Sequence, residues 1–288
     1  MHGTVDGFSY GLVTPLVAYF MACLGGALGL RCTTRAILVT QSWRPGWLVL
    51  GSAAIGSGIW TMHFVAMMGF TVKEAPINYD MRLTFASLGV AVLMVGIGIF
   101  IVGYRGASGT ALFTGGTITG LGIASMHYLG MAGMRLNGNL EYDTFTVSVS
   151  VVIAVVAATA ALWAAGQVRG FMWSVGASLV MGLAVSGMHY TGMAALRVHL
   201  HGGPGSPEGT SSAGLLAPLM IGPLAFLLLA GVVVLLDPLV VMGKPGRGPA
   251  DNKPGIPAHP AVPRPGRRLP QSPGRSHEYR GSRTPQNR

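Results

Sequence analysis

Long stretches without a charged residue constrain this chain more than any other feature of its sequence. No Asp, Glu, Lys or Arg occurs in residues 7–30, 45–72 or 106–134. About 20 consecutive apolar residues cross a bilayer as one helix. A soluble domain would carry charges on roughly a quarter of its residues, whereas this chain has 10% charged residues. The sequence therefore predicts a multi-pass membrane protein whose main partner is the lipid bilayer.

Cutting the apolar stretches at charged residues and at clusters of Gly, Pro or Asn gives seven expected helices. They cover residues 8–30, 46–70, 83–104, 111–134, 146–168, 171–196 and 215–242. Such segments are too long for barrel strands, and a helix satisfies its own backbone hydrogen bonds in lipid. The expected fold class is therefore all-α, with seven transmembrane helices.

Basic residues at the helix ends predict the orientation, because they favour the cytoplasmic side. With the N-terminus outside, fifteen of the nineteen Lys and Arg residues fall on the cytoplasmic side, and ten of these follow Val241. The four on the outer side are Lys73, Arg82, Arg135 and Arg197. We therefore expect the N-terminus outside and the C-terminus in the cytoplasm. The formal net charge of +10 belongs mainly to the C-terminal tail, so no nucleic-acid partner is expected.

The composition changes after the seventh expected helix. Residues 244–288 contain ten prolines and ten basic residues and few apolar ones, which is too little apolar surface to form a core. We expect a membrane domain over residues 1–242 and a disordered, basic, Pro-rich cytoplasmic tail over residues 243–288. The tail is expected to touch anionic lipid headgroups or, alternatively, to dock a separate cytoplasmic partner.

A short motif recurs near the ends of the second, fourth and sixth expected helices. Its order is Met, His, an aromatic residue, any residue, a small residue and Met. The copies cover residues 62–67, 126–131 and 188–193, and their histidines are His63, His127 and His189. Since two membrane crossings separate successive copies, all three histidines are expected at one depth, near the outer face.

Part of this repeat extends beyond the motif. Tyr79-Asp80 and Tyr142-Asp143 follow the first two copies, whereas the third copy is followed by His199, His201 and Glu208 in an expected exposed loop. We expect Asp80 and Asp143 to cap the helices that begin next to them. The alternative is a role as metal ligands, as proton relays or in orienting the histidines.

Each motif copy places an imidazole and a thioether on one helix face, because residues four positions apart share a face. If the three helices meet, three imidazoles and at least three thioethers converge. This set of ligands favours copper, particularly Cu(I), over zinc and iron. The candidate metal ligands are His63, His127, His189, Met67, Met131, Met193, Met62, Met126 and Met188.

A second interpretation of the motif is helix packing. In that interpretation the histidine hydrogen-bonds across helices, the methionine fills gaps, and the small residue allows close approach. Gene duplication would copy a packing motif as readily as a ligand motif. Sequence spacing does not encode the order of the helices around the bundle, so convergence of the three copies stays open.

The three motif copies and the Tyr-Asp pairs resemble the MHYT family of bacterial integral membrane sensor domains. The resemblance covers about residues 10–196, and only Met188-His189-Tyr190-Thr191 spells the signature literally. It implies a plasma-membrane sensor in which copper, held by the motif residues, responds to oxygen, carbon monoxide or nitric oxide. Many relatives carry cyclic di-GMP synthesis or degradation domains. The tail here is too short for one, so we expect no enzymatic activity and a separate signalling partner.

Three other functions remain possible from the sequence. Copper transport or donation would use the same imidazole and thioether ligands. A haem-binding membrane oxidoreductase would use His127 and His189 as axial ligands. A purely structural module would need the motif only for packing.

Overall fold

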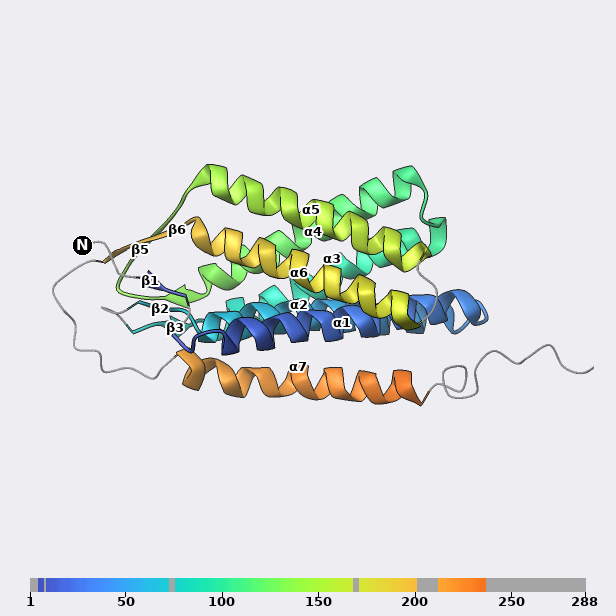
Figure 1. Ribbon diagram of the computed structural model, residues 1–288, viewed down its shortest axis with the longest axis horizontal. Helices are drawn as coiled ribbons and strands as arrows, with labels where there is room; N and C mark the ends of the chain where they lie inside the picture. Colours follow the sequence, from blue (N-terminus) through green and yellow to red (C-terminus); the bar gives the residue numbers. More distant parts are fainter. Residues whose placement is uncertain (1–4, 8, 73–75, 168–170, 201–211, 237–288) are drawn as a thin grey trace, which may run out of the picture. The chain divides into compact units, whose positions relative to one another are not determined.

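The computed structural model describes residues 5–7, 9–72, 76–167, 171–200 and 212–236. In this part of the chain the helices are α1 (Val13–Leu38), α2 (Arg44–Met68), α3 (Met81–Arg105), α4 (Gly109–Ala132), α5 (Thr144–Gln167), α6 (Phe171–Ala194) and α7 (Ser212–Leu235), as Figure 1 shows. The all-α fold class is therefore confirmed.

Six of the helices in the described ranges are long and apolar enough to cross a membrane. Helix α4 is the one left out, because its sequence is rich in glycine and threonine. The protein is a multi-pass membrane protein, as expected. The count of seven spans and the orientation of the termini stay predictions, and the tail expected from residue 243 lies outside the described residues.

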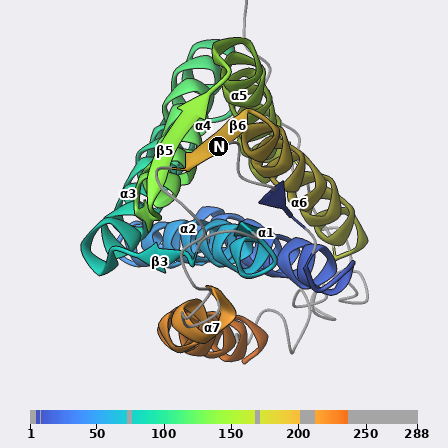
Figure 2. The same cartoon turned by 90° about the vertical axis from the view of Figure 1, so that its left-hand side faces the viewer.

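The first six helices form three hairpins, each closed by a short antiparallel strand pair. Strand β1 (Val5–Asp6) pairs with β2 (Thr71–Val72), β3 (Asn78–Tyr79) with β4 (Met134–Arg135), and β5 (Gly138–Tyr142) with β6 (Leu196–Leu200). Figure 2 shows the hairpins α1–α2, α3–α4 and α5–α6 as three sides of a triangle, with α7 packed outside against α1 and α2. The helical unit is thus a threefold repeat with one additional helix.

Equivalent backbone hydrogen bonds define where each repeat begins. The amides of Ser9, Asp80 and Asp143 donate to the carbonyl oxygens of Gly69, Gly133 and Ala195 at 3.0, 2.8 and 2.9 Å. Each bond joins the start of a hairpin to its end. The Tyr-Asp pairs therefore open the second and third repeats, and a serine takes the place of the aspartate in the first. This explains why no Tyr-Asp pair follows the third motif.

Three expected helix ends are wrong. The first helix was expected to end at residue 30 but continues to Leu38 and includes Arg31 and Arg35. Arginine is a good helix former, and its long side chain reaches polar surroundings from an apolar helix end. Met134 and Leu196, expected at the ends of helices, instead lie in β4 and β6.

Glycines allow the helices to touch through their backbones. A Cβ atom added at Gly25 in α1 would lie 2.7 Å from the carbonyl oxygen of Ala54 and from Cα of Gly58, both in α2. A Cβ at Gly120 in α4 would lie 2.4 Å from Cα of Val155 in α5. Close helix contact at small residues is typical of membrane proteins, and here it fixes the positions of the histidine-bearing helices.

Candidate metal centre

The three motif histidines meet at the centre of the triangle, near the strand end of the bundle. His63 comes from α2, His127 from α4 and His189 from α6, and each is at most 1% exposed. Their Nδ1 atoms lie 3.0 Å (His63–His189), 3.2 Å (His63–His127) and 3.3 Å (His127–His189) apart. The sequence left convergence open, and the structure brings the three residues together.

The three nitrogens leave space for one small ion. The point equidistant from the Nδ1 atoms lies about 1.8 Å from each, which is the mean separation divided by √3. Imidazole nitrogen binds zinc at about 2.0–2.1 Å, so a slight widening of the triangle accommodates a metal of this size. The rings are nearly perpendicular in pairs, with interplanar angles of 81°, 77° and 89°, and Nδ1 is the atom through which each ring contacts the other two.

Hydrogen bonding alone does not satisfy this cluster. Each nitrogen of a neutral imidazole is either a hydrogen-bond donor or a hydrogen-bond acceptor. Among three Nδ1 atoms in mutual contact, at least two are therefore of the same kind and form no hydrogen bond with each other. The Nε2 atoms of His63 and His127 are also buried and have no hydrogen-bond partner in the described part of the chain. Buried polar atoms without partners cost free energy. A cation at the centre would accept all three Nδ1 lone pairs with the protons on Nε2.

In two motif copies the small residue lies against the histidine of another copy. A Cβ added at Gly130 would lie 2.6 Å from Nε2 of His63, and one at Gly192 would lie 2.5 Å from Nε2 of His127. The small residues thus allow close helix approach, as expected. They do so specifically where a neighbouring imidazole needs the space.

The third side of the cluster is less tightly closed. Ala66 stands where the other copies have glycine, and it lines a cavity of about 270 Å³ together with His189, Tyr190 and Met193. The cavity lies on the α2–α6 side and also includes Gly7, next to β1. His189 is therefore the imidazole that lines a cavity large enough for a small molecule.

The aromatic residue of each motif packs edge-on against its own histidine. The ring centroids of His63–Phe64, His127–Tyr128 and His189–Tyr190 are 4.6, 4.8 and 5.0 Å apart, with interplanar angles of 80°, 78° and 78°. Each imidazole therefore has the same orientation relative to its own motif aromatic.

Two supporting contacts were not predicted from the sequence. The Trp60 indole, fully buried, donates to the Ser87 hydroxyl at 2.9 Å and to the Thr84 carbonyl oxygen at 3.1 Å. The hydroxyls of Tyr128 and Ser150 are 2.6 Å apart. These bonds attach α2 to α3 and α4 to α5. The sequence signal for Trp60 is its place three residues before His63, on the same side of α2.

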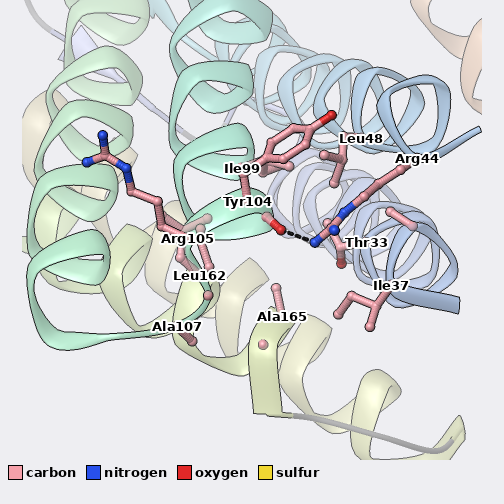
Figure 3. Close-up of a pocket in the computed structure, with 15 residues that line it drawn as sticks. Thr33, Ile37, Arg44, Leu48, Ile99, Tyr104, Arg105, Ala107, Leu162 and Ala165 are labelled. Carbon is pink, nitrogen blue, oxygen red and sulfur yellow. Dashed lines mark hydrogen bonds between the residues drawn. The ribbon is translucent and has the colours of Figure 1, made fainter. Parts of the chain in front are cut away.

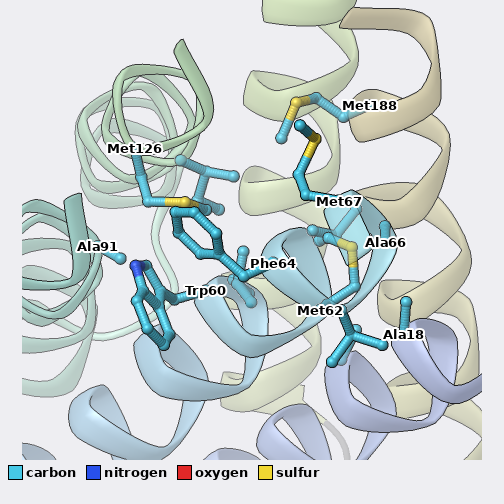
Figure 4. Packing of buried hydrophobic residues seen from close by; sticks show 14 of the residues in the cluster. Ala18, Trp60, Met62, Phe64, Ala66, Met67, Ala91, Met126 and Met188 are labelled. Carbon is cyan, nitrogen blue, oxygen red and sulfur yellow. The ribbon is translucent and has the colours of Figure 1, made fainter. Parts of the chain in front are cut away.

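Motif methionines occupy the apolar core around Trp60 and Phe64, as Figure 4 shows for Met62, Met67, Met126 and Met188. These four and Met131 are at most 1% exposed, whereas Met193 is half-buried beside the cavity. Their role as metal ligands stays a prediction.

Asp80 and Asp143 act as helix caps, as expected. Asp80 accepts hydrogen bonds from the backbone of Arg82 and Leu83 at 2.9 and 3.2 Å and forms an ion pair with Arg135 at 3.1 Å. Asp143 accepts from the backbone and hydroxyl of Thr146 at 2.9 and 2.7 Å.

These bonds favour the charged carboxylates. The pKa of Asp80 is lowered mainly by the side-chain hydrogen bond from Arg135 and then by the backbone bond from Leu83. The pKa of Asp143 is lowered mainly by the Thr146 hydroxyl and then by its backbone amide.

The expected exposed loop is not found at His199. This residue lies in β6 and is 3.2 Å from the Glu141 carboxylate of β5. His201 and Glu208 lie outside the described residues.

Comparisons with known proteins also find three repeats, each beginning within α2, α4 or α6 and not at the start of a hairpin. The family described as "MHYT: Bacterial signalling protein N terminal repeat" matches residues 56–115, 120–178 and 182–235. The chain is 37% identical over 235 residues to the bifunctional diguanylate cyclase/cyclic di-GMP phosphodiesterase MucR of Pseudomonas aeruginosa, which covers 80% of this chain and 34% of MucR. It is 35% identical over 204 residues to the cyclic di-GMP phosphodiesterase NbdA of the same organism, covering 67% of this chain and 26% of NbdA.

A third relative is the signaling protein YkoW of Bacillus subtilis, 30% identical over 198 residues, which covers 66% of this chain and 24% of YkoW. The chain thus spans about a quarter to a third of the length of these relatives. No solved structure is similar to it.

Proposed function

Because the chain belongs to the MHYT family of bacterial signalling proteins, we propose that it is a membrane sensor whose three-histidine centre holds a metal ion that responds to the signal. The observation that carries this proposal is the convergence of three buried Nδ1 atoms within 3.3 Å of one another. Burial at this depth favours neutral imidazole, which is the form that binds a metal.

The metal that we propose is copper. Three imidazoles form the centre, and no carboxylate or thiolate among the described residues belongs to this group of candidate ligands. Nitrogen ligands supplemented by thioethers would favour copper, particularly Cu(I). The ligand set that we propose comprises the three histidines, supplemented by thioethers from Met62, Met67, Met126, Met131, Met188 and Met193.

The signal that we propose is a diatomic gas (oxygen, carbon monoxide or nitric oxide) or a change of redox state. Copper would supply affinity for a diatomic molecule and a one-electron redox change. The cavity of about 270 Å³ beside His189 supports this proposal, since it gives a small molecule space next to one of the imidazoles.

The geometry favours this function over haem binding. A haem iron with two axial histidines needs the macrocycle between the two imidazoles, but Nδ1 of His127 and Nδ1 of His189 are 3.3 Å apart and His63 completes the contact. Copper transport remains the second candidate for the same ligands. It requires a path along the bundle, whereas the histidines lie near one end.

We propose that the response passes to a separate cytoplasmic partner. The relatives named above as cyclic di-GMP enzymes suggest that the partner makes, degrades or senses this nucleotide. A change at the centre would shift the three hairpins against one another, because α2, α4 and α6 each contribute one histidine.

Metal analysis of the detergent-purified protein tests the proposal. We expect close to one copper ion per chain after loading with Cu(I), and X-ray absorption should show nitrogen ligands with or without sulfur. Replacing any one of His63, His127 or His189 by Ala should lower copper occupancy by at least about tenfold, because supporting residues alone cost about 10–100-fold. His199→Ala is the matched control, since this histidine pairs with Glu141 in the strands.

Two results would contradict the proposal. Absence of metal after loading, with all three variants less stable than the wild type, would make the motif a packing element. Copper retained by all three single variants would place the metal elsewhere. Release of copper on the opposite side of proteoliposomes would instead favour transport, whereas a spectral change on titration with carbon monoxide or nitric oxide supports sensing.

A further inference from the structure

A second cavity lies at the other end of the bundle, where α1, α2, α3 and α5 come together. It has a volume of about 380 Å³, within the range of about 300–1,000 Å³ typical of ligand pockets. Figure 3 shows it between Ile37 of α1, Arg44 and Leu48 of α2, Tyr104 of α3 and Leu162 of α5. None of the motif histidines or methionines lines it.

The inner wall of this cavity is apolar. Leu48, Ile99, Val102 and Leu162 are at most 7% exposed. A smaller apolar cavity shares Thr33, Ile99, Leu162 and Ala165 with it and extends the apolar lining towards Met181 and Val185 in α6. The interior therefore suits a hydrocarbon chain.

The rim of the cavity is exposed and basic. Ile37 and Tyr104 are 48% and 53% exposed, and Arg105 is also at the surface. The Arg44 guanidinium lies 5.1 Å from the Tyr104 ring centroid and donates through Nη2 to the Gly103 carbonyl oxygen. Figure 3 shows Arg105 extending away from Arg44.

Arg44 retains capacity for an anion. Its Nε is buried with no hydrogen-bond partner in the described ranges, and a guanidinium has five N–H donors. Of the described residues that line the cavity, none is acidic. A carboxylate or phosphate would supply the missing acceptors, since guanidinium groups bind both strongly.

We propose that this cavity binds an amphiphile with a single acidic head and one apolar chain. The head lies at Arg44 and the chain lies between Leu48, Ile99 and Leu162. Because the ligand contacts helices of all three hairpins, its binding stabilises one arrangement of them. This proposal does not depend on the metal centre.

Photo-crosslinking of the detergent-purified full chain tests the proposal. The probes are a diazirine-bearing fatty acid, the corresponding acylglycerol phosphate and the neutral methyl ester of the fatty acid. We expect crosslinks in peptides that contain Leu48, Ile99 or Leu162, and at least about tenfold weaker labelling by the ester, as charge-assisted hydrogen bonds predict. Labelling by the fatty acid assigns a carboxylate head, and labelling by the phosphate alone assigns a lipid phosphate.

Variants separate this site from general lipid contact. Arg44→Gln should lower labelling by the acidic probe about tenfold, to the level of the ester, whereas Arg44→Lys should retain most of it. Ala165→Phe should block all probes by filling the cavity. Arg35→Gln is the matched control, because Arg35 lies over the Trp47 ring at 5.7 Å and does not line the cavity.

Crosslinks confined to lipid-facing residues such as Val152 and Val156 would overturn the proposal. Equal labelling of the wild type and a folded Arg44→Gln variant would also overturn it. Copper occupancy should be unchanged in Arg44→Gln, so failure here is distinguishable from failure of the metal proposal.

Discussion

His63, His127 and His189 face one another through the same ring atom, and their surroundings keep them there. Each ring packs against its motif aromatic, and two of them rest against a glycine of another copy. Because neither glycine has space for a methyl group, the positions of the imidazoles depend on residues that bind no ligand themselves.

Gly130→Ala should therefore disturb the centre without removing a ligand. The new Cβ would lie 2.6 Å from Nε2 of His63 and displace this ring from its present position. We expect copper affinity to fall by about 10–100-fold, as for other residues that position ligands, measured by competition with a Cu(I) chelator.

Gly187→Ala provides the control for this substitution. Gly187 lies two residues before His189 in α6, and a Cβ there meets no atom of the described chain within 4 Å. Its copper affinity should equal that of the wild type. Equal affinities in both variants would show that Gly130 does not position His63.

Asp80 and Asp143 should make stability depend on acid pH. Both have a lowered pKa in the folded protein, so their contribution is complete above the ordinary carboxyl pKa and is lost as pH falls through the lower, folded value. The thermal midpoint in detergent should fall more steeply below about pH 4 in the wild type than in Asp80→Asn/Asp143→Asn. An equal fall of the thermal midpoint with pH in both proteins would contradict this stabilising role of the two carboxylates.

At the level of helices, backbone contact between neighbours makes the bundle sensitive to added methyl groups. Gly120→Ala would place a Cβ 2.4 Å from Cα of Val155 in α5, and no side-chain rotation relieves this overlap. Overpacking costs about 1–3 kcal/mol, which lowers the melting temperature by roughly 2–4 °C per kcal/mol for a protein of this size.

Gly89→Ala should not lower the melting temperature. This glycine is exposed in α3, and a Cβ there meets no described atom within 4 Å. Alanine is favoured over glycine within a helix by about 1 kcal/mol, so the midpoint should stay equal or rise. A decrease of equal size in both variants would mean that helix contact is not the cause.

The sequence predicted the helices better than the connections between them. Charge-free apolar stretches identified all seven helices, but cutting at Arg31 ended α1 too early. Strands β1 to β4 were missed because they are only two residues long, too short to show alternation. The repeat frame was missed because the Tyr-Asp pairs were assigned to the motif copies before them, whereas Asp80 and Asp143 begin the next repeat, in line with their expected capping of the helices that follow.

The candidate centre was predictable in composition and not in geometry. Spacing placed His63, His127 and His189 at one depth, and the structure confirms that they meet. The spacing did not reveal that the three rings meet through Nδ1, or that Gly130 and Gly192 lie against imidazoles of other copies. Those facts depend on how the three hairpins pack, which no local pattern encodes.

Over the whole helical unit, the three-histidine centre is least closed beside His189. The alanine at position 66 and the adjoining cavity occur on this side. We expect Ala194→Phe, at the edge of the cavity, to slow the reaction of the loaded protein with oxygen or nitric oxide by about tenfold or more while copper occupancy stays the same. Stopped-flow absorbance provides the measurement.

The matched control is the same substitution at the equivalent position of another motif copy. Ala132 holds the corresponding position in the second motif copy and is also exposed, but it does not line this cavity. Ala132→Phe should react at the wild-type rate. If both variants are slowed equally, the small molecule reaches the centre by another path.

The distribution of the histidines along the chain has a consequence for biogenesis. Residues 63, 127 and 189 belong to three successive hairpins, so a ribosome must deliver six helices to the membrane before the third imidazole exists. If the proposed ion binds through all three imidazoles, its capture must come after insertion of the third hairpin, and a nascent chain halted after its second hairpin has at most two of the three nitrogens. The ion would thus distinguish a chain with all three hairpins from a shorter one.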